Sequence, residues 1–485
     1  MRTNPHILEI NTRAGLSRLE AKHGRRFVLH EIPDSYWRTF KNRGFDAVWL
    51  MGVWQQSPKA REIAQTHPDI QEAIKKIKPT YSIDDVIASP YAVYDYEPAQ
   101  DLGGRESLRQ LREKLNSMGI LLFLDFVPNH LAIDNPMVNA APDLFINTGT
   151  QEPHIHKDWF FQNKNGVWIA HGRDPYFAPW TDSAQLNYFN PSTKKFMLDN
   201  LLKVASMCDG VRCDMAMLTL NKVHRDTWWE FIGGNLPKEE FWSVALERVR
   251  QDHPDFVFIA EVYWGLEWEI QEMGFDYTYD KVLYDRLRFS TPQDIKGHLR
   301  AEHLFQMRSM RFTSNHDEEE SLTAFGREIS LAASTIIATL PGARMIYLFQ
   351  LMGRQTRLPI QYIKDDFEED FTIRDYYDKL LKIASKPVFH GGQWSLTDVQ
   401  AAEDNSAGNI LCWTWKQMNT AAIVFINYSD SPSKCRIKPQ RLSTEHKTWH
   451  EEFSGQDVEL NDEQIREGIE ITLQPFESKI FTYTM

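Results

Sequence analysis

Cysteine is scarce in this sequence, and no long apolar run occurs in it. Four cysteines in 485 residues are too few for a disulfide scaffold, and their spacing does not match a zinc site. No run approaches the roughly 20 apolar residues that span a bilayer. The N-terminal segment lacks the apolar stretch of a secretory signal. We therefore expect a protein of a reducing compartment, the cytoplasm, with no membrane partner.

Positive charge is in deficit. The 54 Lys and Arg residues face 67 Asp and Glu residues, which gives a formal net charge of -13. An acidic surface repels phosphate groups, so we expect no nucleic-acid partner and no adhesion to anionic membranes. The hydrophobic share of 42% is ordinary for a globular chain, and the length suits one large domain with a smaller appendage.

Apolar runs of strand length alternate with amphipathic helical segments along most of the chain. Helical spacing is found at 34–44, 105–119, 192–207, 238–251, 322–339 and 371–386. The strand candidates are 6–11, 46–54, 120–130, 209–217, 255–264, 275–280, 310–317 and 343–349. Eight strands alternating with helices predict an α/β fold, an eight-stranded (β/α)8 TIM barrel. An open, doubly wound sheet is the alternative; the strand count and the polar strand ends favour the barrel.

Two segments break this alternation. Residues 131–188 are irregular and rich in Pro, Asn, His and Trp, which indicates a subdomain inserted after strand three. From about residue 390 the helical pattern gives way to short alternating strands, which predict a C-terminal antiparallel β domain. We therefore expect a barrel from 1–130 and 189–389, an inserted subdomain at 131–188, and a β-sandwich domain at 390–485.

Charged or polar residues follow four of the predicted strands. A single Asp or His after a strand is usually a cap or a turn residue. Four such clusters would all face one barrel mouth, where barrel active sites lie, and this favours a functional interpretation. Burying a lone charge in an apolar strand would cost several kcal/mol. The clusters are Asp125, Asn129 and His130; Arg212 and Asp214; Glu261; and His316 with Asp317.

The segments "DFVPNH", "GVRCDMAML", "FIAEVYW" and "FTSNHD" together resemble the four short conserved regions of the α-amylase family, glycoside hydrolase family 13. Their order matches strands three, four, five and seven of that family's barrel. The long insertion resembles the family's domain B and the terminal β region its domain C, so the resemblance covers nearly the whole chain.

The resemblance implies a role for each matching residue. Asp214 matches the nucleophile, Glu261 the general acid/base, and Asp317 the third carboxylate, which holds sugar hydroxyls. The expected substrate-binding residues are Tyr91, Asp125, His130, Arg212 and His316. Among these, Arg212 holds the nucleophile, the two histidines grip the glucosyl ring, and Tyr91 stacks on it.

Elementary electrostatics assigns the same two roles to the central carboxyl groups. Retaining cleavage of a glycosidic bond needs one ionised and one protonated carboxyl group, about 5–5.5 Å apart. The adjacent Arg212 should lower the pKa of Asp214 and keep it ionised. The apolar surroundings of Glu261 should raise its pKa towards that of a general acid.

The sequence departs from the family pattern after the nucleophile. Met217 and Leu218 stand where many members have Lys and His, so we expect an apolar surface on the leaving-group side and weaker use of long glucan chains. Asn129 keeps one calcium-ligand position, but no carboxylates that would complete a site are recognisable in 131–188. We expect no cofactor and no metal, and calcium is not favoured.

Two other segments leave alternatives open. In "HDEEES", residues 316–321, the Glu residues after Asp317 fit a solvated helix N-terminus better than a second metal site. After the last strand, Gln350, Arg354 and Arg357 could contact substrate or anchor their loop by ion pairs.

The leading hypothesis is a retaining, α-amylase-like hydrolase that cleaves α-glucosidic bonds of α-glucans or oligosaccharides. A transglucosylase that uses glucans or sucrose shares the covalent intermediate and is the first alternative. A non-catalytic carbohydrate-binding member is the second; it ranks lower because all three carboxylates and the arginine are present.

Overall fold

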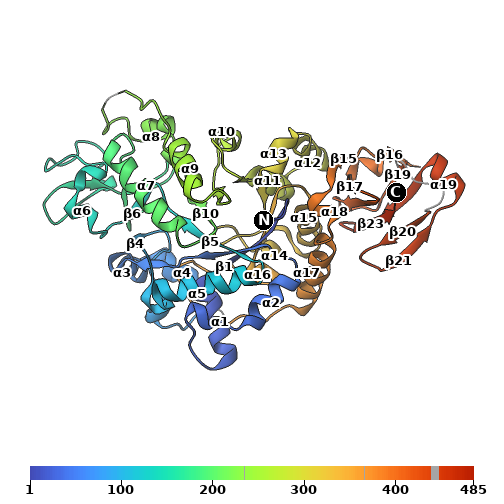
Figure 1. The fold of residues 1–485 in the computed structure, drawn as a ribbon, viewed down its shortest axis with the longest axis horizontal. Coiled ribbons are helices and arrows are strands. Elements are labelled where there is room, and N and C mark those ends of the chain that lie inside the picture. Colours follow the sequence, from blue (N-terminus) through green and yellow to red (C-terminus); the bar gives the residue numbers. More distant parts are fainter. Residues whose placement is uncertain (234, 365, 403, 439–446, 485) are drawn as a thin grey trace.

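Eight parallel strands form a closed barrel in a computed structural model that describes residues 1–233, 235–364, 366–402, 404–438 and 447–484 (Figure 1). The strands are β1 (His6–Asn11), β2 (Ala47–Met51), β5 (Leu121–Phe126), β10 (Gly210–Cys213), β11 (Val257–Ala260), β12 (Tyr277–Tyr279), β13 (Ser309–Arg311) and β14 (Ala343–Tyr347). The first strand pairs in parallel with both β2 and β14. This closure confirms the barrel and excludes the open sheet.

Helices on the outside of the barrel connect these strands. They include α1 (Thr12–His23), α2 (Asp34–Asn42), α5 (Gly104–Ser117), α7 (Pro191–Ala205), α9 (Phe241–Asp252), α11 (Lys281–Phe289), α15 (Arg327–Thr339) and α17 (Phe371–Ala384). The first of them was not predicted. It begins directly after β1, where the Asn11 side chain accepts a hydrogen bond from the Ala14 amide as an N-cap. In the described part of the chain, no helix is both long and apolar enough to cross a bilayer.

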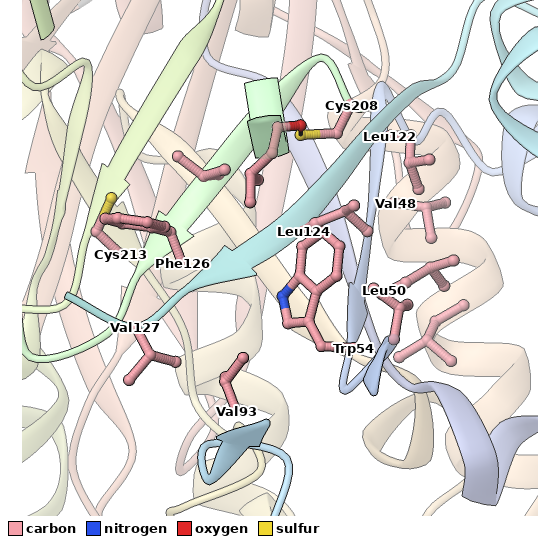
Figure 2. Close-up of a cluster of buried hydrophobic side chains, with 14 of the residues drawn as sticks. Val48, Leu50, Trp54, Val93, Leu122, Leu124, Phe126, Val127, Cys208 and Cys213 are labelled. Carbon is pink, nitrogen blue, oxygen red and sulfur yellow. Dashed lines mark hydrogen bonds between the residues drawn. The ribbon is translucent and has the colours of Figure 1, made fainter. Parts of the chain in front are cut away.

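Side chains alternate between the two faces of the barrel wall. One set packs outwards against the helices; Figure 2 shows Leu122 and Leu124 of β5 in a cluster with Val48, Leu50 and Trp54. The residues between them point into the barrel. Because the period of a strand is two, this alternation places charged residues of β5 and β10 on the inner face and leaves apolar neighbours outside.

Two insertions extend from the carboxyl side of the barrel. The predicted irregular segment contains two short antiparallel pairs, β6 (His130–Ala132) with β9 (Ser183–Gln185) and β7 (Phe160–Gln162) with β8 (Trp168–Ala170). A helical hairpin of α3 (Pro58–Thr66) and α4 (Pro68–Ile77) lies between β2 and α5 and was not predicted.

The described residues of the C-terminal region, which leave out 403, 439–446 and 485, form two antiparallel sheets. The larger sheet holds β15 (Gln393–Leu396), β17 (Ile410–Gln417), β18 (Thr420–Asn427), β23 (Ser478–Thr484), β20 (Thr448–Glu451) and β21 (Gln456–Glu459); the smaller holds β16 (Gln400–Ala401), β19 (Ser433–Ile437) and β22 (Ile469–Leu473). One continuous apolar cluster joins the larger sheet to α15 of the barrel. At this contact, Trp415 Nε1 donates a hydrogen bond to the Thr339 carbonyl at 2.7 Å.

Candidate active site

Arg212 lies on the inner face of β10 and is fully buried. Its Nη1 is 2.5 Å from Asp214 Oδ1, and its Nη2 is 2.8 Å from Glu261 Oε2. One guanidinium therefore contacts both central carboxyl groups. Asp214 follows β10 and Glu261 follows β11, so two neighbouring strand ends supply the pair.

Aromatic rings complete the surroundings of this arginine. Its guanidinium carbon lies 5.2 Å from the ring centre of Tyr91, 5.4 Å from Trp49 and 5.6 Å from Tyr279. Arg212 Nε also donates to the Tyr279 hydroxyl at 3.3 Å. Two carboxyl groups and three ring faces thus offset the desolvation of the buried charge. This explains why an arginine and an aspartate stand two residues apart in an apolar strand.

Glu261 is held by two hydrogen bonds besides its contact with Arg212. The Tyr263 hydroxyl donates to Oε1 at 2.7 Å, and the Met215 amide donates to Oε2 at 2.7 Å. Burial raises the pKa of Glu261 to about 7, because desolvation and the nearby Asp214 outweigh the opposing charge of Arg212. The raised pKa of Glu261 was expected from the sequence, and it suits a general acid.

The pKa of Asp214 was expected to be low, but it is raised. Burial of the carboxyl group is the largest cause, and it outweighs the charge and hydrogen bond of Arg212. The sequence argument included the neighbouring arginine and left out the desolvation of a side chain that is only 6% exposed. Arg212 limits this rise and is the main influence that favours the ionised form.

Asp317 and His316 form a second pair at the cavity mouth. His316 Nε2 lies 2.8 Å from Asp317 Oδ2 and 2.6 Å from the Tyr91 hydroxyl. Partial burial would raise the pKa of Asp317, but the charge of His316 and its hydrogen bond lower it to about 2. The Asp317 side chain remains 48% exposed, so an ionised oxygen is available to a ligand.

A cavity of about 820 Å³ opens above these groups. Of the eight predicted site residues, five line it: Tyr91, His130, Asp214, Glu261 and Asp317. The His130 ring packs against Trp180 with ring centres 5.0 Å apart, and burial lowers its pKa to about 4, which keeps the imidazole neutral.

The other three predicted residues lie beneath the cavity lining. Arg212 and His316 contact the lining carboxyl groups directly. Asp125 is 1% exposed and accepts hydrogen bonds from Trp49 Nε1 and the Gly52 amide, both at 3.2 Å. Burial raises the pKa of Asp125 to about 7. Its part in substrate binding stays a prediction.

Sequence reasoning missed three residues that shape the site: Glu9, Tyr263 and Tyr279. Glu9 had a usable signal, since it is the only acidic residue in the apolar run "HILEIN" and occupies an inward position of β1. Tyr263 stands two residues after Glu261, within the same quoted motif. Nothing in the sequence singles out Tyr279, because an aromatic residue in a barrel strand is ordinary core.

The expected apolar surface at Met217 is wrong. Met217 is fully buried in the core, and Met215 lines the cavity instead. The chain turns sharply at Met215, where φ is 41°, and the following residues fold inwards as a short 3-10 helix. The expected preference for short substrates therefore loses its basis in Met217.

The segment after Asp317 is also less solvated than expected. Glu320 is fully buried next to Arg354, whose Nε lies 4.0 Å from its carboxylate. Gln350 donates to the hydroxyls of Thr313 and Tyr377, and Arg357 Nη1 donates to the Asp317 carbonyl at 2.5 Å. These contacts favour loop anchoring over substrate contact.

At the position where the family resemblance would place a calcium ligand, the side chains of Asn129 and Gln185 hydrogen-bond to each other. Asn129 Oδ1 accepts a hydrogen bond from Gln185 Nε2 at 2.9 Å, and the same amide donates to the carbonyls of Asn129 and Leu186. No cluster of three or more His, Cys, Asp or Glu residues in the described part of the chain is arranged to hold a metal. The Gln185 amide thus contacts three oxygens around Asn129, the kind of atom that calcium also prefers.

A barrel with three carboxyl groups converging at its carboxyl-terminal mouth is typical of glycoside hydrolases. The family model described as "Alpha amylase, catalytic domain" matches residues 38–398, and this chain belongs to the α-amylase family.

Known relatives are distant in sequence. The α-amylase MalA of Haloarcula japonica is 24% identical over 357 residues, which are 71% of this chain and 48% of that protein. α-Amylase 3 of Dictyoglomus thermophilum is 23% identical over 68% of this chain and 61% of its own length. The chain thus spans about half to three fifths of these relatives. The crystal structure of the maltogenic α-amylase AmyB of Thermotoga neapolitana shares the fold, with a TM-score of 0.69 at 18% identity over 99% of both chains.

Proposed function

We propose that this protein is a retaining glycoside hydrolase that cleaves α-glucosidic bonds of α-glucans or oligosaccharides. The observation that carries the proposal is the single Arg212 guanidinium that contacts both Asp214 and Glu261 below one cavity. Because both carboxyl groups contact one guanidinium, they lie close to each other. This favours the short carboxyl–carboxyl distance of retaining enzymes over the longer distance that, in inverting enzymes, leaves room for a water molecule.

The proposed reaction has two steps. The Asp214 carboxylate attacks the anomeric carbon while the bond to the glycosidic oxygen breaks and Glu261 gives its proton to that oxygen. The product is a glycosyl ester on Asp214. Glu261, now a carboxylate, then takes a proton from water, whose oxygen attacks the anomeric carbon and releases Asp214.

Arg212 faces one negative charge at every stage of this cycle. Before attack the charge is on Asp214, and in the ester it is on Glu261, 2.8 Å away from the other guanidinium nitrogen. The cation therefore needs no rearrangement as charge moves between its two partners. Asp317 supplies an ionised, half-exposed oxygen for sugar hydroxyls in the transition state.

Maltose to maltoheptaose, soluble starch and sucrose form the substrate panel that tests this function. We expect hydrolysis with the α-anomer as the first product in proton NMR. Asp214→Asn should abolish turnover with an unchanged circular dichroism spectrum, while the exposed control Asp199→Asn should match wild type. The β-anomer as first product would indicate inversion, and loss of fold would make Asp214 structural.

The same product analysis separates the alternatives. Longer glucans formed from maltooligosaccharides, or glucosyl transfer from sucrose, would indicate a transglucosylase. Binding without turnover of any panel member would indicate a non-catalytic carbohydrate-binding protein.

We also infer that the enzyme uses no calcium and works in the cytoplasm, on α-glucans or related glucosides, without nucleic-acid or membrane partners. The hydrogen bonds of Gln185 support the first point. All four cysteines are buried as free thiols, which supports a reducing compartment. Alkylation in denaturant without reductant should therefore modify four thiols.

A further inference from the structure

A carboxyl group of the first barrel strand lies below the cavity without touching it. Glu9 points inwards from β1, in register with Trp49 of β2 and Tyr347 of β14. Its side chain has no solvent exposure. The Oε2 atom has no hydrogen-bond partner among the described residues. The cost of burying this carboxyl group must therefore be offset by the contact that Oε1 makes.

That contact is His316. Glu9 Oε1 lies 2.5 Å from His316 Nδ1, on the side of the ring opposite to Asp317. The ring cannot turn, because Tyr91 stacks on it at 5.3 Å between ring centres and Trp49 meets it edge-on at 5.6 Å. Asp317 Oδ2 and the Tyr91 hydroxyl lie 2.8 Å and 2.6 Å from Nε2.

These contacts determine the protonation of His316. A neutral imidazole donates from one nitrogen only, whereas His316 places a carboxylate oxygen against each of its two nitrogens. With Glu9 and Asp317 both ionised, the two contacts are attractive only if both nitrogens carry protons. Burial raises the pKa of Glu9, and the charge and hydrogen bond of His316 oppose that rise and favour the carboxylate. Burial alone would lower the pKa of His316, but the charges of Asp317 and Glu9 outweigh it and raise the pKa to about 10.

We propose that Glu9 is a positioning residue that keeps His316 doubly protonated and fixed, so that His316 can hold Asp317 and Tyr91 at the cavity mouth. The functional part of this inference depends on the proposed glycosidase function, because it assumes that Asp317 and Tyr91 bind the sugar. The protonation part does not, since it concerns the free protein.

Glu9 is the partner that solvent cannot screen. Asp317 is 48% exposed, so water weakens its hold on the imidazolium, whereas Glu9 is completely enclosed. Without the charge of Glu9, only the half-exposed Asp317 would oppose the burial that favours the neutral ring. The other ionisable groups around the Glu9–His316 pair are Tyr91, Asp125, Arg212, Asp214 and Tyr279.

Histidine titration by NMR tests the proposal directly. In protein labelled with ¹⁵N-histidine, the His316 signal is identified by its loss in His316→Asn. We expect no titration of His316 in wild type from pH 5 to 9. Glu9→Gln keeps the shape but removes the charge and should bring the titration into this range; Glu9→Asp should shift it less. Glu451→Gln, which alters a buried carboxyl group of the C-terminal domain, is the matched control. In this variant, the His316 signal should behave as it does in wild type.

Kinetics supplies the second readout. In Glu9→Gln we expect kcat/KM to fall by about 10- to 100-fold, mainly through kcat, because the groups at the mouth lose their fixed geometry. The loss should grow as pH rises through the new titration of His316, and Glu9→Asp should recover part of it.

Each result decides between positioning and mere packing. A His316 that stays charged to pH 9 in folded Glu9→Gln overturns the proposal, even if activity falls. If Glu9→Gln does not fold, Glu9→Asp decides alone: a wild-type titration and wild-type kcat overturn the proposal. If wild type cleaves none of the glucosides tested, the proposed function fails, while the titration still answers the question about Glu9.

Discussion

At the scale of single residues, the proposed mechanism depends on keeping two similar carboxyl groups, those of Asp214 and Glu261, in different protonation states. Both are buried, and both contact Arg212. With a pKa of about 7, Glu261 keeps a large protonated fraction near pH 7, and in the proposed first step it gives up that proton. Their hydrogen-bond partners differ: the Tyr263 hydroxyl and the Met215 amide donate to Glu261, whereas Arg212 Nη1 donates to Asp214.

The pH profile should show this division. Because the pKa of Glu261 is about 7 and its acid form is needed, kcat/KM should fall as pH rises through about 7. Because burial raises the pKa of Asp214, the acidic limb should lie above the usual range for aspartate. Asp317, with a pKa of about 2, should not contribute. A profile that is flat between pH 6 and 9 would contradict this assignment of the acid.

Removing the Tyr263 hydroxyl should shift the alkaline limb. This hydroxyl donates to Glu261 Oε1 and thereby favours the carboxylate. In Tyr263→Phe the pKa of Glu261 should rise, because its carboxylate loses a hydrogen-bond donor. The alkaline limb of the kcat/KM profile should therefore move to higher pH, by about one unit if the hydrogen bond is worth roughly 1.5 kcal/mol. Tyr176→Phe, at an exposed position, is the control. An unchanged limb would mean that Tyr263 does not influence the acid.

At the scale of elements, the barrel strands deliver the site, and β10 does so under tight packing. A Cβ atom added at Gly210 would lie 2.7 Å from the Val257 carbonyl oxygen and 2.8 Å from the Phe123 ring. Neighbouring strands on both sides thus press against this position. Any larger residue would displace the strand that carries Arg212.

Gly210→Ala should therefore destabilise the fold by about 1–3 kcal/mol and also reduce kcat. Urea unfolding and kinetics measure the two effects. Gly297→Ala is the matched control, because that helical position has open space for a Cβ atom and alanine favours helix. Equal stability of Gly210→Ala and wild type would show that the barrel relaxes at this point.

The junction between the barrel and the inserted subdomain should not depend on metal. EDTA should leave Tm unchanged, because the Gln185 amide joins the strand-three loop to β9. Gln185→Ala should cost about 1–3 kcal/mol, since buried acceptors lose their donor. Gln162→Ala, on an exposed strand position, should be neutral. A fall in Tm with EDTA that calcium reverses would contradict the proposal.

The elements show how far the sequence could predict the structure. Strand positions were predictable because apolar runs of strand length alternate with helical segments. The predicted strands extend too far towards their C-terminal ends. The strand predicted at 209–217 is Gly210–Cys213 in the structure, because the residues that follow leave the sheet to form the site. Glu9 escaped notice because its importance depends on which distant strands become neighbours, and spacing along one chain does not contain that information. The α3–α4 hairpin did have local signals, the Ser57 N-cap and a proline at the start of each helix, and these were overlooked.

At the scale of the whole molecule, one arginine, Arg344, and two histidines, His6 and His390, lie buried together where the barrel meets the C-terminal domain. Arg344 is buried beside His6, and its Nη2 donates to the carbonyl of Phe389. His390 follows Phe389 in the chain, and its ring centre lies 5.2 Å from that of His6. Burial, followed by the charge of Arg344, lowers the pKa of both histidines, that of His390 to about 3. Both are therefore neutral in the folded protein.

Acid should weaken this junction. The unfolded chain binds protons at these histidines below about pH 6.5, whereas the folded chain does not, so stability is greatest above pH 6.5 and falls as pH decreases towards 3. His390→Asn should reduce the slope of unfolding free energy against pH by about 1.4 kcal/mol per unit between pH 6 and 4. The exposed His303→Asn should not change it. Identical slopes in wild type and His390→Asn would contradict the assignment.

The closure of the barrel by its first and last strands has a consequence for biosynthesis. Strand β1 emerges from the ribosome before the other barrel strands, but its partner β14 ends at Tyr347, and Glu9 and His316 are 307 positions apart in the chain. Until then, the carboxyl group of Glu9 has no imidazole to face. A product terminated before that point carries Asp214 and Glu261, the proposed nucleophile and acid, yet lacks a closed barrel wall to hold them. Incomplete chains should therefore be inert towards glucosides rather than weakly active.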